Sequence, residues 1–473
     1  MGMRKGIQRF VWRHGVLRER PGLRDALEQF TRSQVLPPDE LAEMAWQKLV
    51  RIVSHAYENV PYYRRRYSEA GFHPGQLKEP SDVVRVPIIS REDLRENLSD
   101  MVADGVDAGR LHLRTTAGST GMPVRSYHDP KIDVLIEAMQ ARVLGWWGIC
   151  PWTDSASVYR RPTGKKEGGG RRRHGRGGLR GAWRALRKLS IMRLCRPSWF
   201  LLDAGNMDPP SMEEFIRKIR QTRPGFIMGY VGAMDVLASH MAKRGHSAGL
   251  PTDAVWVTAA ALTQSQRLHM ESVFGCPVYD QYGCSEAYWL AAECTAQAGL
   301  HVMSDCRHVE VLDDEGRPAP PGVPGRVVIT DLEDYSAPII RYENGDVATR
   351  KEGTCPCGLT LPLMGSIEGR ITENIVLKDG TVIIGYCIGA VLGTRVDHVR
   401  NYQLHQDAID HMTVRIAPTA GADVRAVLPD IQREFADKVK GLMRLDYEIV
   451  DSIDYGRGKP RRIICDVAPQ GGP

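Results

Sequence analysis

A short segment rich in hydroxyl groups and glycine is the first part of the chain whose composition suggests chemistry. The segment 113–123, LRTTAGSTGMP, holds four Ser/Thr hydroxyls and two glycines and contains no aromatic side chain. Glycines let backbone N–H groups approach phosphate oxygens, and the hydroxyls can donate further hydrogen bonds. Runs of this composition are often plain turns, so the segment alone is weak evidence for a phosphate site. Its candidate phosphate ligands are Thr116, Gly118, Ser119, Thr120 and Gly121.

This segment lacks the cation of a Walker-type phosphate loop. Such a loop carries a lysine and then Ser or Thr after its last glycine. Here Met122 and Pro123 follow Gly121. A cation for the phosphates would therefore have to come from another part of the chain.

Two later segments carry groups that suit a nucleotide and its magnesium ion. In DQYGCSEA (280–287), Tyr282 offers a flat face for a base, and Glu286 offers the hard carboxylate oxygens that Mg2+ prefers. In IIRYENGDVA (339–348), Asp346 follows a turn and could accept hydrogen bonds from both hydroxyls of a ribose. The structural alternatives are a core aromatic residue and solvated carboxylates.

The elements that must position these groups alternate between strand and helix from about residue 155 to 290. Phe215, Ile216 and Ile219 form an apolar stripe at helical spacing, as expected for a helix that covers a sheet. This alternation predicts a mainly parallel sheet with helices on its faces. The expected strands are 155–161, 225–231, 254–260 and 276–283, and the expected helices are 211–221 and those that carry Met234 and Met270.

Three other regions have a different character. Residues 38–105 read as mostly helical, and 308–350 read as hairpin-like strands with Pro/Gly turns. A boundary is expected near GRIT (369–372), followed by a small α+β domain. In that domain MTVRIAP (412–418) alternates as a strand, and residues 428–439 carry the apolar stripe of a helix.

In this order, the motifs resemble those of the adenylate-forming, acyl-activating ligases, and most closely the phenylacetate–coenzyme A ligase-like branch. The resemblance covers about residues 40–465, and the set in order is far more specific than any single motif. The segments that carry it are DQYGCSEA (280–287), IIRYENGDVA (339–348), EGRITENIVLKDG (368–380), YGRGKPRRII (455–464), ENVPYYRRRYSEAGF (58–72) and VPIISREDLRENL (86–98).

The resemblance implies catalytic roles for Thr120, Glu286 and Lys459. A Ser/Thr/Gly loop holds the triphosphate in these ligases, and a lysine from a mobile C-terminal domain reaches the reacting atoms. Charge builds on the α-phosphate and the departing pyrophosphate, so the three groups would converge there, with magnesium on Glu286. The nucleotide-binding residues implied in this way are Thr116, Gly118, Ser119, Gly121, Tyr282, Gly283, Asp346 and Arg370.

The resemblance also implies the fold and its pivot. The expected α/β protein has a large adenylating domain, 1–368, with mainly parallel helix-covered sheets and a small β-barrel-like part, and a small mobile α+β domain, 369–473. The hinge falls at Thr372, where an acidic residue or lysine is usual, so threonine is a departure. Tyr230 and Ala260 are expected to line the acyl and adenine side of the pocket, although packing alone would equally explain small residues there.

The implied function is ATP- and Mg2+-dependent conversion of a carboxylic acid into an acyl-adenylate and then a coenzyme A thioester. An aromatic acid fits the branch. One alternative keeps the adenylation and passes the acyl group to an amine or to a carrier-protein thiol. A second alternative is a non-catalytic homologue that keeps the fold. Intact Thr120, Glu286, Asp346 and Lys459 argue against that last alternative.

Four Cys and His residues form a candidate zinc site. AECTAQAGLHV contains Cys294 and His301, and GTCPCGL contains Cys355 and Cys357. Thiolates with an imidazole suit tetrahedral Zn2+, and four protein ligands would leave no open position, so the ion would be structural. Cys306 and His308 are substitutes in the sequence, and buried free thiols are the structural alternative.

Composition limits the class of protein. The chain has 473 residues, 42% apolar and 25% charged, and a net charge of +6, as in a soluble protein of two or three domains. No apolar run is long enough to span a membrane. The ten cysteines indicate reduced thiols or metal ligands, and a cytoplasmic location is the expectation. The basic N-terminal segment 1–20 predicts a solvated helix or, alternatively, one that touches anionic lipid.

One insert accounts for the whole positive charge. Residues 160–190 hold twelve Lys or Arg residues and one Glu, so nothing else in the chain suggests nucleic-acid binding. A flexible solvated insert is expected, and an electrostatic dock for an acidic carrier protein or a coenzyme phosphate is the alternative. A homodimer is compatible with the sequence.

Overall fold

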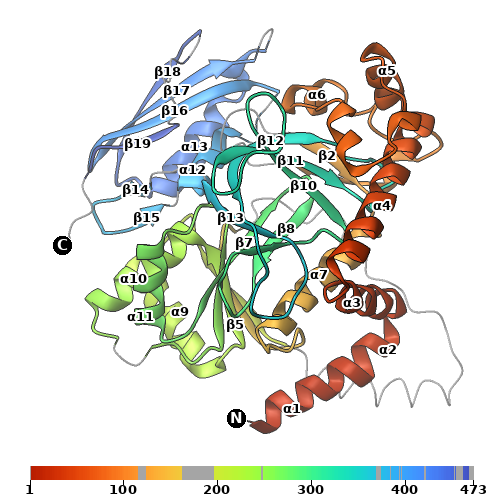
Figure 1. Ribbon diagram of the computed structural model, residues 1–473. Helices are drawn as coiled ribbons and strands as arrows, with labels where there is room; N and C mark the ends of the chain where they lie inside the picture. The colour runs from red at the N-terminus through yellow and green to blue at the C-terminus, as the bar shows by residue number, and fades with distance from the viewer. Residues whose placement is uncertain are drawn as a thin grey trace, which may run out of the picture.

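The computed structural model consists of a large part on one continuous sheet and a C-terminal part on a smaller sheet (Figure 1). It describes residues 2–115, 124–161, 197–246, 249–368, 374–383, 385–393, 395, 397–419, 422–451, 453 and 462–467.

Half of the large sheet is parallel and covered by helices, as the sequence predicts. Its strand order is β4-β3-β5-β6-β7, and each neighbouring pair is parallel. Asp208 caps the helix that follows β4 by accepting a hydrogen bond from Ser211 N at 2.7 Å. The elements of this half are β3 (Ser155–Tyr159), β4 (Trp199–Asp203), α9 (Pro209–Thr222), β5 (Phe226–Tyr230), α10 (Val231–Lys243), β6 (Ala254–Thr258), α11 (Gln264–Phe274) and β7 (Val278–Cys284).

The other half of the sheet is antiparallel and continues from β7 in the order β8-β9-β13-β12-β11-β10. The hairpin-like strands expected at 308–350 are confirmed. A small β-barrel-like part was expected from the sequence. In the structure these strands continue the same sheet as the parallel half. Its strands are β8 (Tyr288–Glu293), β9 (Leu300–Val302), β10 (Arg307–Leu312), β11 (Pro324–Asp331), β12 (Tyr342–Arg350) and β13 (Leu363–Glu368).

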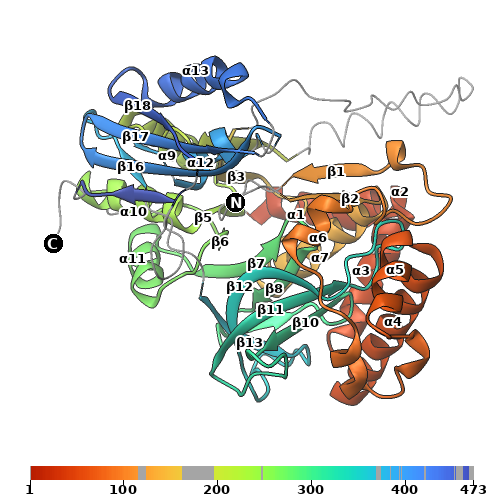
Figure 2. The same ribbon diagram turned by 90° about the horizontal axis from the view of Figure 1, so that it is seen from above.

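Helices from residues 38 to 96 lie beside the antiparallel half (Figure 2). The long helix α4 (Pro38–Asn59) begins with a proline and two acidic residues in its first turn, and Pro61 follows its end. Its buried face, with Leu49 and Ile52, shares a core with the sheet residues Val327 and Ile329. The helices that follow it are α5 (Pro61–Glu69), a 3-10 turn at Pro80–Arg85 and α6 (Arg91–Glu96).

The N-terminal helices pack against α7. Trp12 and Val16 are buried in a core that includes Met139 of α7, whereas Ile7 and Phe10 of α1 are exposed. Lys5 pairs with Asp253 at 2.7 Å. In the part of the chain that is described, no helix is both long and apolar enough to cross a bilayer. These helices are α1 (Gly2–Val11), a π-helical turn at Trp12–Val16, α2 (Leu17–Glu19), α3 (Pro21–Ser33) and α7 (Ile132–Trp146).

The C-terminal part is α+β, as predicted, with the strand order β18-β17-β16-β19. Phe435 and Val439 of the predicted helix 428–439 are buried against the sheet. A helix at 385–393, GYCIGAVLG, was not predicted, because its glycines and nearly uniform apolarity give no amphipathic pattern. The elements are β14 (Ile375–Val376), β15 (Val382–Ile383), α12 (Gly385–Gly393), β16 (Val399–Ala408), β17 (His411–Pro418), α13 (Leu428–Val439), β18 (Arg444–Ile449) and β19 (Ile463–Cys465).

Candidate functional site

Eight of the predicted site residues lie outside the described residues, so their roles stay predictions. They belong to the phosphate loop, the hinge and the C-terminal lysine segment. Most of the basic insert also lies outside. The eight residues are Thr116, Gly118, Ser119, Thr120, Gly121, Arg370, Thr372 and Lys459.

The strands on either side of the candidate phosphate loop are described. They are β1 (His112–Thr115) and β2 (Arg125–His128), an antiparallel pair in which Thr115 lies opposite Arg125. The Arg125 guanidinium donates a hydrogen bond to Asp397 of the C-terminal part at 3.0 Å. The C-terminal part therefore contacts the chain directly after the candidate loop.

The carboxyl ends of the parallel strands meet at one edge of the sheet, where ligands of open α/β sheets bind. Tyr230, the last residue of β5, pairs in register with Thr258, the last residue of β6. The next residue, Ala259, has a φ of +72°, a left-handed conformation that costs free energy in a residue other than glycine. Such strain concentrates at functional sites, so this edge is a candidate for ligand binding.

Tyr230 and Ala260 lie together at this edge. The Tyr230 ring meets the ring of Tyr159, at the end of β3, edge to face with centroids 4.7 Å apart. Both Tyr230 and Ala260 are partly buried and pack against the same hydrophobic core. Burial raises the pKa of Tyr159, so its hydroxyl stays protonated. Tyr230 and Ala260 could therefore form the wall of a ligand pocket, and packing of the hydrophobic core would equally explain their positions.

Tyr282 and Asp346 are in direct contact. The Tyr282 hydroxyl donates to Asp346 Oδ2 at 2.9 Å, and Asn344 Nδ2 donates to the same oxygen at 2.8 Å. Asn344 Nδ2 also donates to the Tyr282 hydroxyl at 2.8 Å. The Tyr282 ring is buried in the core, with 7% of its surface exposed, whereas Asp346 is partly exposed. Two neutral donors thus fix a carboxylate that remains accessible from solvent.

Glu286 lies close to this pair in a second small network. The Tyr342 hydroxyl donates to Glu286 Oε1 at 3.0 Å, and Glu286 is only 2% exposed. Arg91, the first residue of α6, donates a hydrogen bond to Tyr342 and interacts electrostatically with Glu286 and Asp346. A buried carboxylate is costly unless it is paired, and this arginine supplies the opposite charge.

The backbone at Gly283 explains why glycine follows Tyr282. The register of β7 against β8 shifts between these two residues, which indicates a β-bulge. A Cβ on Gly283 would lie 2.2 Å from the carbonyl oxygen of Tyr288. Any other residue would displace β8 and with it the loop that carries Glu286. The contribution of Gly283 described here is therefore to backbone geometry.

Burial controls the protonation of the groups around this edge. Burial, and then the Asp346 carboxylate, raise the pKa of Tyr282 well above its usual value, so its hydroxyl remains a donor. Burial and then Glu293 raise the pKa of Asp280, on the same strand, to about 7, against the opposing effect of Arg267. Asp280 is thus a carboxyl group that changes charge near neutral pH.

Sequence reasoning missed Tyr342, Asn344 and Arg91. A signal for two of them was present: residues 342, 344 and 346 alternate on one strand, so they were candidates for one face of it. Arg91 lies in the segment VPIISREDLRENL, which belongs to the resemblance but carried no assigned role.

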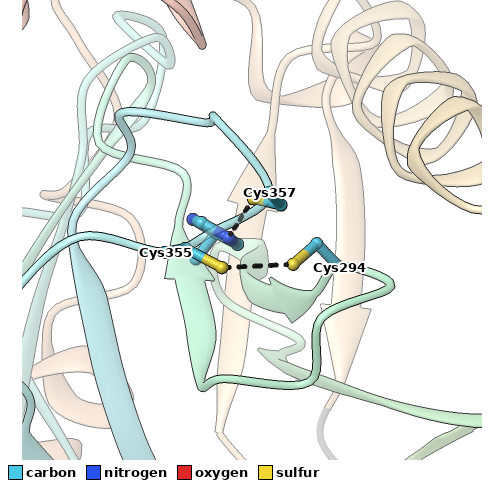
Figure 3. A group of neighbouring side chains, drawn as sticks. Cys294, Cys355 and Cys357 are labelled. Carbon is cyan, nitrogen blue, oxygen red and sulfur yellow. Dashed lines mark hydrogen bonds between the residues drawn. The ribbon is translucent and has the colours of Figure 1, made fainter.

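The four candidate zinc ligands come together, as predicted (Figure 3). The ligand atoms of Cys294, His301, Cys355 and Cys357 all lie within 4.8 Å of one another. Cys294 Sγ lies 3.5 Å from Cys355 Sγ, and Cys357 Sγ lies 3.4 Å from His301 Nε2. The chemistry and spacing of these donors fit a tetrahedral metal site.

The surroundings of this cluster orient its ligands. His301 Nδ1 lies 3.2 Å from the carbonyl oxygen of Leu361, which selects the tautomer with Nε2 free to face the thiols. Leu359 N donates to Cys357 Sγ at 3.4 Å, and the ring of Trp146 meets the His301 ring edge to face. Burial lowers the pKa of His301, which favours the neutral imidazole that binds metals.

The two substitutes named from the sequence do not belong to the metal cluster. Within the described residues, the group that could hold a metal contains neither Cys306 nor His308. The Cys306 thiol is buried and lies 3.4 Å from Met139 Sδ. His308 Nε2 lies 3.9 Å from Glu310 on β10.

Sequence comparisons connect the chain to one group of ligases. No protein-family model matches it. The chain is 28% identical to the phenylacetate-coenzyme A ligase of Thermus thermophilus over 379 residues, which are 78% of this chain and 79% of the relative. It is 28% identical to the Escherichia coli enzyme of the same name over 72% of this chain and 73% of the relative. Protein CapK of Staphylococcus aureus is 18% identical over 90% of both chains.

Solved structures show the same fold. A 2-hydroxyisobutyryl-CoA ligase, in complex with 2-HIB-AMP and CoA in the thioesterification state, matches over 92% of both chains with a TM-score of 0.60 and 24% identity. The same ligase in the postadenylation state gives a TM-score of 0.58. The α/β fold expected from the sequence is therefore confirmed.

Proposed function

From its relationship to the phenylacetate-coenzyme A ligases, we propose that the chain joins a carboxylic acid to AMP and then transfers the acyl group to coenzyme A. ATP is the first cosubstrate and pyrophosphate the first product. The acyl-adenylate is a mixed anhydride with a good leaving group, and the thiol of coenzyme A displaces AMP from it. Because ATP and reduced thiols are available in the cytoplasm, we expect the reaction to take place there.

The observation that carries this proposal is the contact between Tyr282 and Asp346 beside Glu286. Asp346 is held by two donors, with its remaining oxygen capacity free for the two hydroxyls of a ribose. The Tyr282 ring borders the same carboxylate and is the candidate for contact with the base. A nucleotide bound in this way would direct its phosphates along the edge where the parallel strands end.

Mg2+ would bind at Glu286 in this proposal. Carboxylate oxygen suits this ion, and Arg91 and Tyr342 hold Glu286 in place. A magnesium ion on the phosphates would help to neutralise the charge of the departing pyrophosphate. We include Arg91 in the site because its positive charge interacts with the carboxylates of both Glu286 and Asp346.

The phosphate loop and the C-terminal lysine complete the proposed site. Thr120 would donate to the phosphates, and Lys459 would neutralise charge at the α-phosphate. The ion pair between Arg125 and Asp397 supports this arrangement, because it holds the C-terminal part against the strand that follows the loop. We propose a boundary between residues 368 and 369 and a pivot at Thr372, with Arg370 near the nucleotide.

We further propose that Cys294, His301, Cys355 and Cys357 bind one structural Zn2+. Four ligands within 4.8 Å of one another and a fixed histidine tautomer support this assignment. The ion would join the segment after β8 to the loop before β13. It would take no part in the reaction, because four protein ligands fill a tetrahedral shell.

Tyr230, Tyr159 and Ala260 are the candidates for the wall of the acyl pocket. The two tyrosine rings and the small alanine leave an aromatic and apolar edge beside the strained Ala259. An aromatic acid fits such an edge. The relatives named for phenylacetate agree with that class of acid, which we propose as the first to test.

The test is acid-dependent exchange of labelled pyrophosphate into ATP, with aryl, arylacetic, amino and fatty acids. We expect exchange with at least one aromatic acid and its loss when Mg2+ is removed. The acceptor is then identified by supplying coenzyme A, an amine or a purified acidic carrier protein to the adenylate. Absence of exchange across the whole panel would contradict the proposal and favour a non-catalytic homologue. Size-exclusion chromatography with light scattering tests for a homodimer.

A further inference from the structure

The first helix, α1, presents an apolar strip to solvent. Gln8 and Val11 face the protein and are buried, whereas Ile7 and Phe10 are 44% and 64% exposed. Because residues three apart lie on the same face of a helix, Ile7 and Phe10 form one strip that points away from the core. The Phe10 ring lies against the ring of His14, with centroids 4.7 Å apart. Two large apolar side chains are therefore held side by side at the surface.

Positive charge surrounds this strip. Residues 1–20 contain six Lys or Arg residues and one Glu. Arg9 is exposed, and its guanidinium donates to the carbonyl oxygen of Gly148 at 3.1 Å. Arg13, in the turn directly after α1, and Arg18, on α2, are also exposed. The apolar strip thus lies on a basic face of the molecule.

Two carboxylates from other elements contact this segment, and each is already paired with a cation. Lys5 Nζ lies 2.7 Å from Asp253. Arg20 binds Glu137 of α7 through two hydrogen bonds of 2.5 and 2.6 Å. The paired carboxylates do little to reduce the positive potential around the strip.

The helix α1 lies across the amino ends of the parallel strands. Asp253, the partner of Lys5, directly precedes β6. Gln8 Nε2 lies 3.4 Å from a carboxylate oxygen of Asp154, which directly precedes β3. The candidate nucleotide site lies at the opposite edge, where these strands end, and α1 forms an outer border of the molecule (Figure 1). A partner bound to α1 would therefore leave the candidate nucleotide site open.

The charge and the apolar strip together select one kind of partner. A second copy of the chain would bring the same positive face against itself, and the segment 160–190 has the same sign of charge, with twelve Lys or Arg residues and one Glu. A nucleic acid would supply negative charge but no apolar layer for Ile7 and Phe10. A membrane that contains anionic lipids offers both, because phosphates lie above the acyl chains.

We propose that α1 binds reversibly to a membrane surface rich in anionic lipids. The helix lies flat in the headgroup region, so that Ile7 and Phe10 reach the boundary with the acyl chains. Arg9 and Arg13 contact the lipid phosphates. A short helix with two apolar side chains on its membrane face gives weak binding, so the chain exchanges between membrane and solution. This binding does not depend on the proposed ligase activity, because α1 lies at the other edge of the sheet.

The experiment is flotation of the full chain with vesicles of phosphatidylcholine alone and of phosphatidylcholine mixed with phosphatidylglycerol. We expect the partition coefficient to be about tenfold or more higher on the anionic vesicles, because each exposed cation gains free energy near a negative surface. High salt should reduce this difference several-fold by screening the charges.

Two sets of variants separate the apolar contribution from the electrostatic one. The double variant Ile7→Ser with Phe10→Ser should lower the partition coefficient on anionic vesicles about tenfold or more, because it removes the apolar surface that the membrane buries. Arg13→Glu should lower it about tenfold on anionic vesicles and change it little on phosphatidylcholine. These side chains are exposed, so the melting temperature should stay close to that of the wild type.

Matched controls lie on other faces of the molecule. Val323→Ser removes an apolar side chain that is 47% exposed in the turn before β11, and it should bind like the wild type. Arg433→Glu reverses a charge at an exposed ion pair on α13 and should also bind like the wild type. Loss of binding in either control equal to that in the α1 variants would overturn the proposal.

Three further outcomes would overturn the proposal. The first is a wild type that does not float with anionic vesicles, including one that binds a purified acidic protein instead. The second is equal binding by the wild type and by the α1 variants, which would assign the lipid contact to another basic part of the chain, such as 160–190. The third is a dimer, detected by light scattering, that Phe10→Ser dissociates. Pyrophosphate exchange is measured without vesicles, so failure of the ligase assignment does not affect the flotation result.

Discussion

The candidate nucleotide site, around Tyr282 of β7, and the metal cluster, which begins at Cys294 directly after β8, are held in different ways. At the nucleotide edge, Tyr282 and Asp346 come from strands far apart in the sequence, and neutral donors hold an accessible carboxylate. In the metal cluster, four ligands from strand β9 and the two loops that follow β8 and precede β13 face one another and are largely buried. The carboxylate of Asp346 can still accept hydrogen bonds from a ligand that binds reversibly. In the metal cluster the four ligand atoms face one another, as expected for a site that holds a structural ion permanently. Variants at the two places should therefore differ: at the edge they should change rates and binding, and at the cluster they should change stability.

The largest effect on activity is expected from Lys459→Ala. If its ammonium stabilises charge at the α-phosphate, pyrophosphate exchange should fall on the order of 10²–10³-fold, with little change in the melting temperature. Exchange kinetics at saturating acid and ATP measure this. Arg433→Ala, at an exposed ion pair on α13, is the control for loss of a cation from the C-terminal part. Undiminished exchange in Lys459→Ala would remove this lysine from the mechanism.

Cys355→Ser should act on stability. Loss of a thiolate ligand should release zinc and lower the free energy of unfolding by on the order of 3–5 kcal/mol, as removal of a structural metal does. Metal analysis by plasma mass spectrometry and denaturant unfolding measure the two effects. Cys276→Ser, at a partly buried thiol outside the cluster, should keep its metal. Wild-type protein purified without chelator and free of zinc would refute the assignment.

Asp346→Asn should weaken ATP binding without unfolding the protein. Loss of a charged acceptor for ribose hydroxyls costs about 1.5–3 kcal/mol, so the KM for ATP should rise roughly 10- to 100-fold. Steady-state kinetics with varied ATP measure this, and the KM for the acid should change much less. Glu343→Gln on the same strand, which pairs with Arg326, is the control. Equal changes in both variants would point to damage to β12 rather than to a ribose contact.

The effect that is confined to one range of pH concerns Asp280. Its pKa is raised to about 7 in the folded state, so the native carboxyl keeps its proton while the unfolded one ionises above about 4. Stability is therefore lost as pH rises from about 4 to 7. Asp280→Asn should remove this loss and stabilise the protein by on the order of 2–4 kcal/mol at pH 8, with little difference near pH 4. Asp313→Asn should give no such gain, because hydrogen bonds from Arg317 lower the pKa of Asp313. Urea unfolding at pH 4 and pH 8 measures the free energy of unfolding of both proteins. If this free energy depended on pH in the same way in the wild type and in Asp280→Asn, the prediction would be wrong.

The order of elements and the grouping of the four metal ligands could be predicted because they depend on local signals. The stripe with Phe215, Ile216 and Ile219 indicates a helix whatever its tertiary surroundings, and the Cys and His side chains supply the soft donors that zinc prefers. Arg91 could not be found in this way, because its partners Glu286 and Tyr342 are distant in sequence and only the fold brings them to α6. The helix at 385–393 was missed because its segment lacks polar residues on one face.

The metal cluster lies close in sequence to the strand that leads into the C-terminal part. Cys355 and Cys357 precede β13 (Leu363–Glu368), which pairs with β9 and β12 and ends at the proposed boundary of the C-terminal part. If the C-terminal part rotates as proposed, the strand that leads to it must stay fixed. A zinc ion bound to Cys294 and Cys355 would tie this loop to the end of β8, so that the rotation would move the proposed catalytic lysine and would not distort β13.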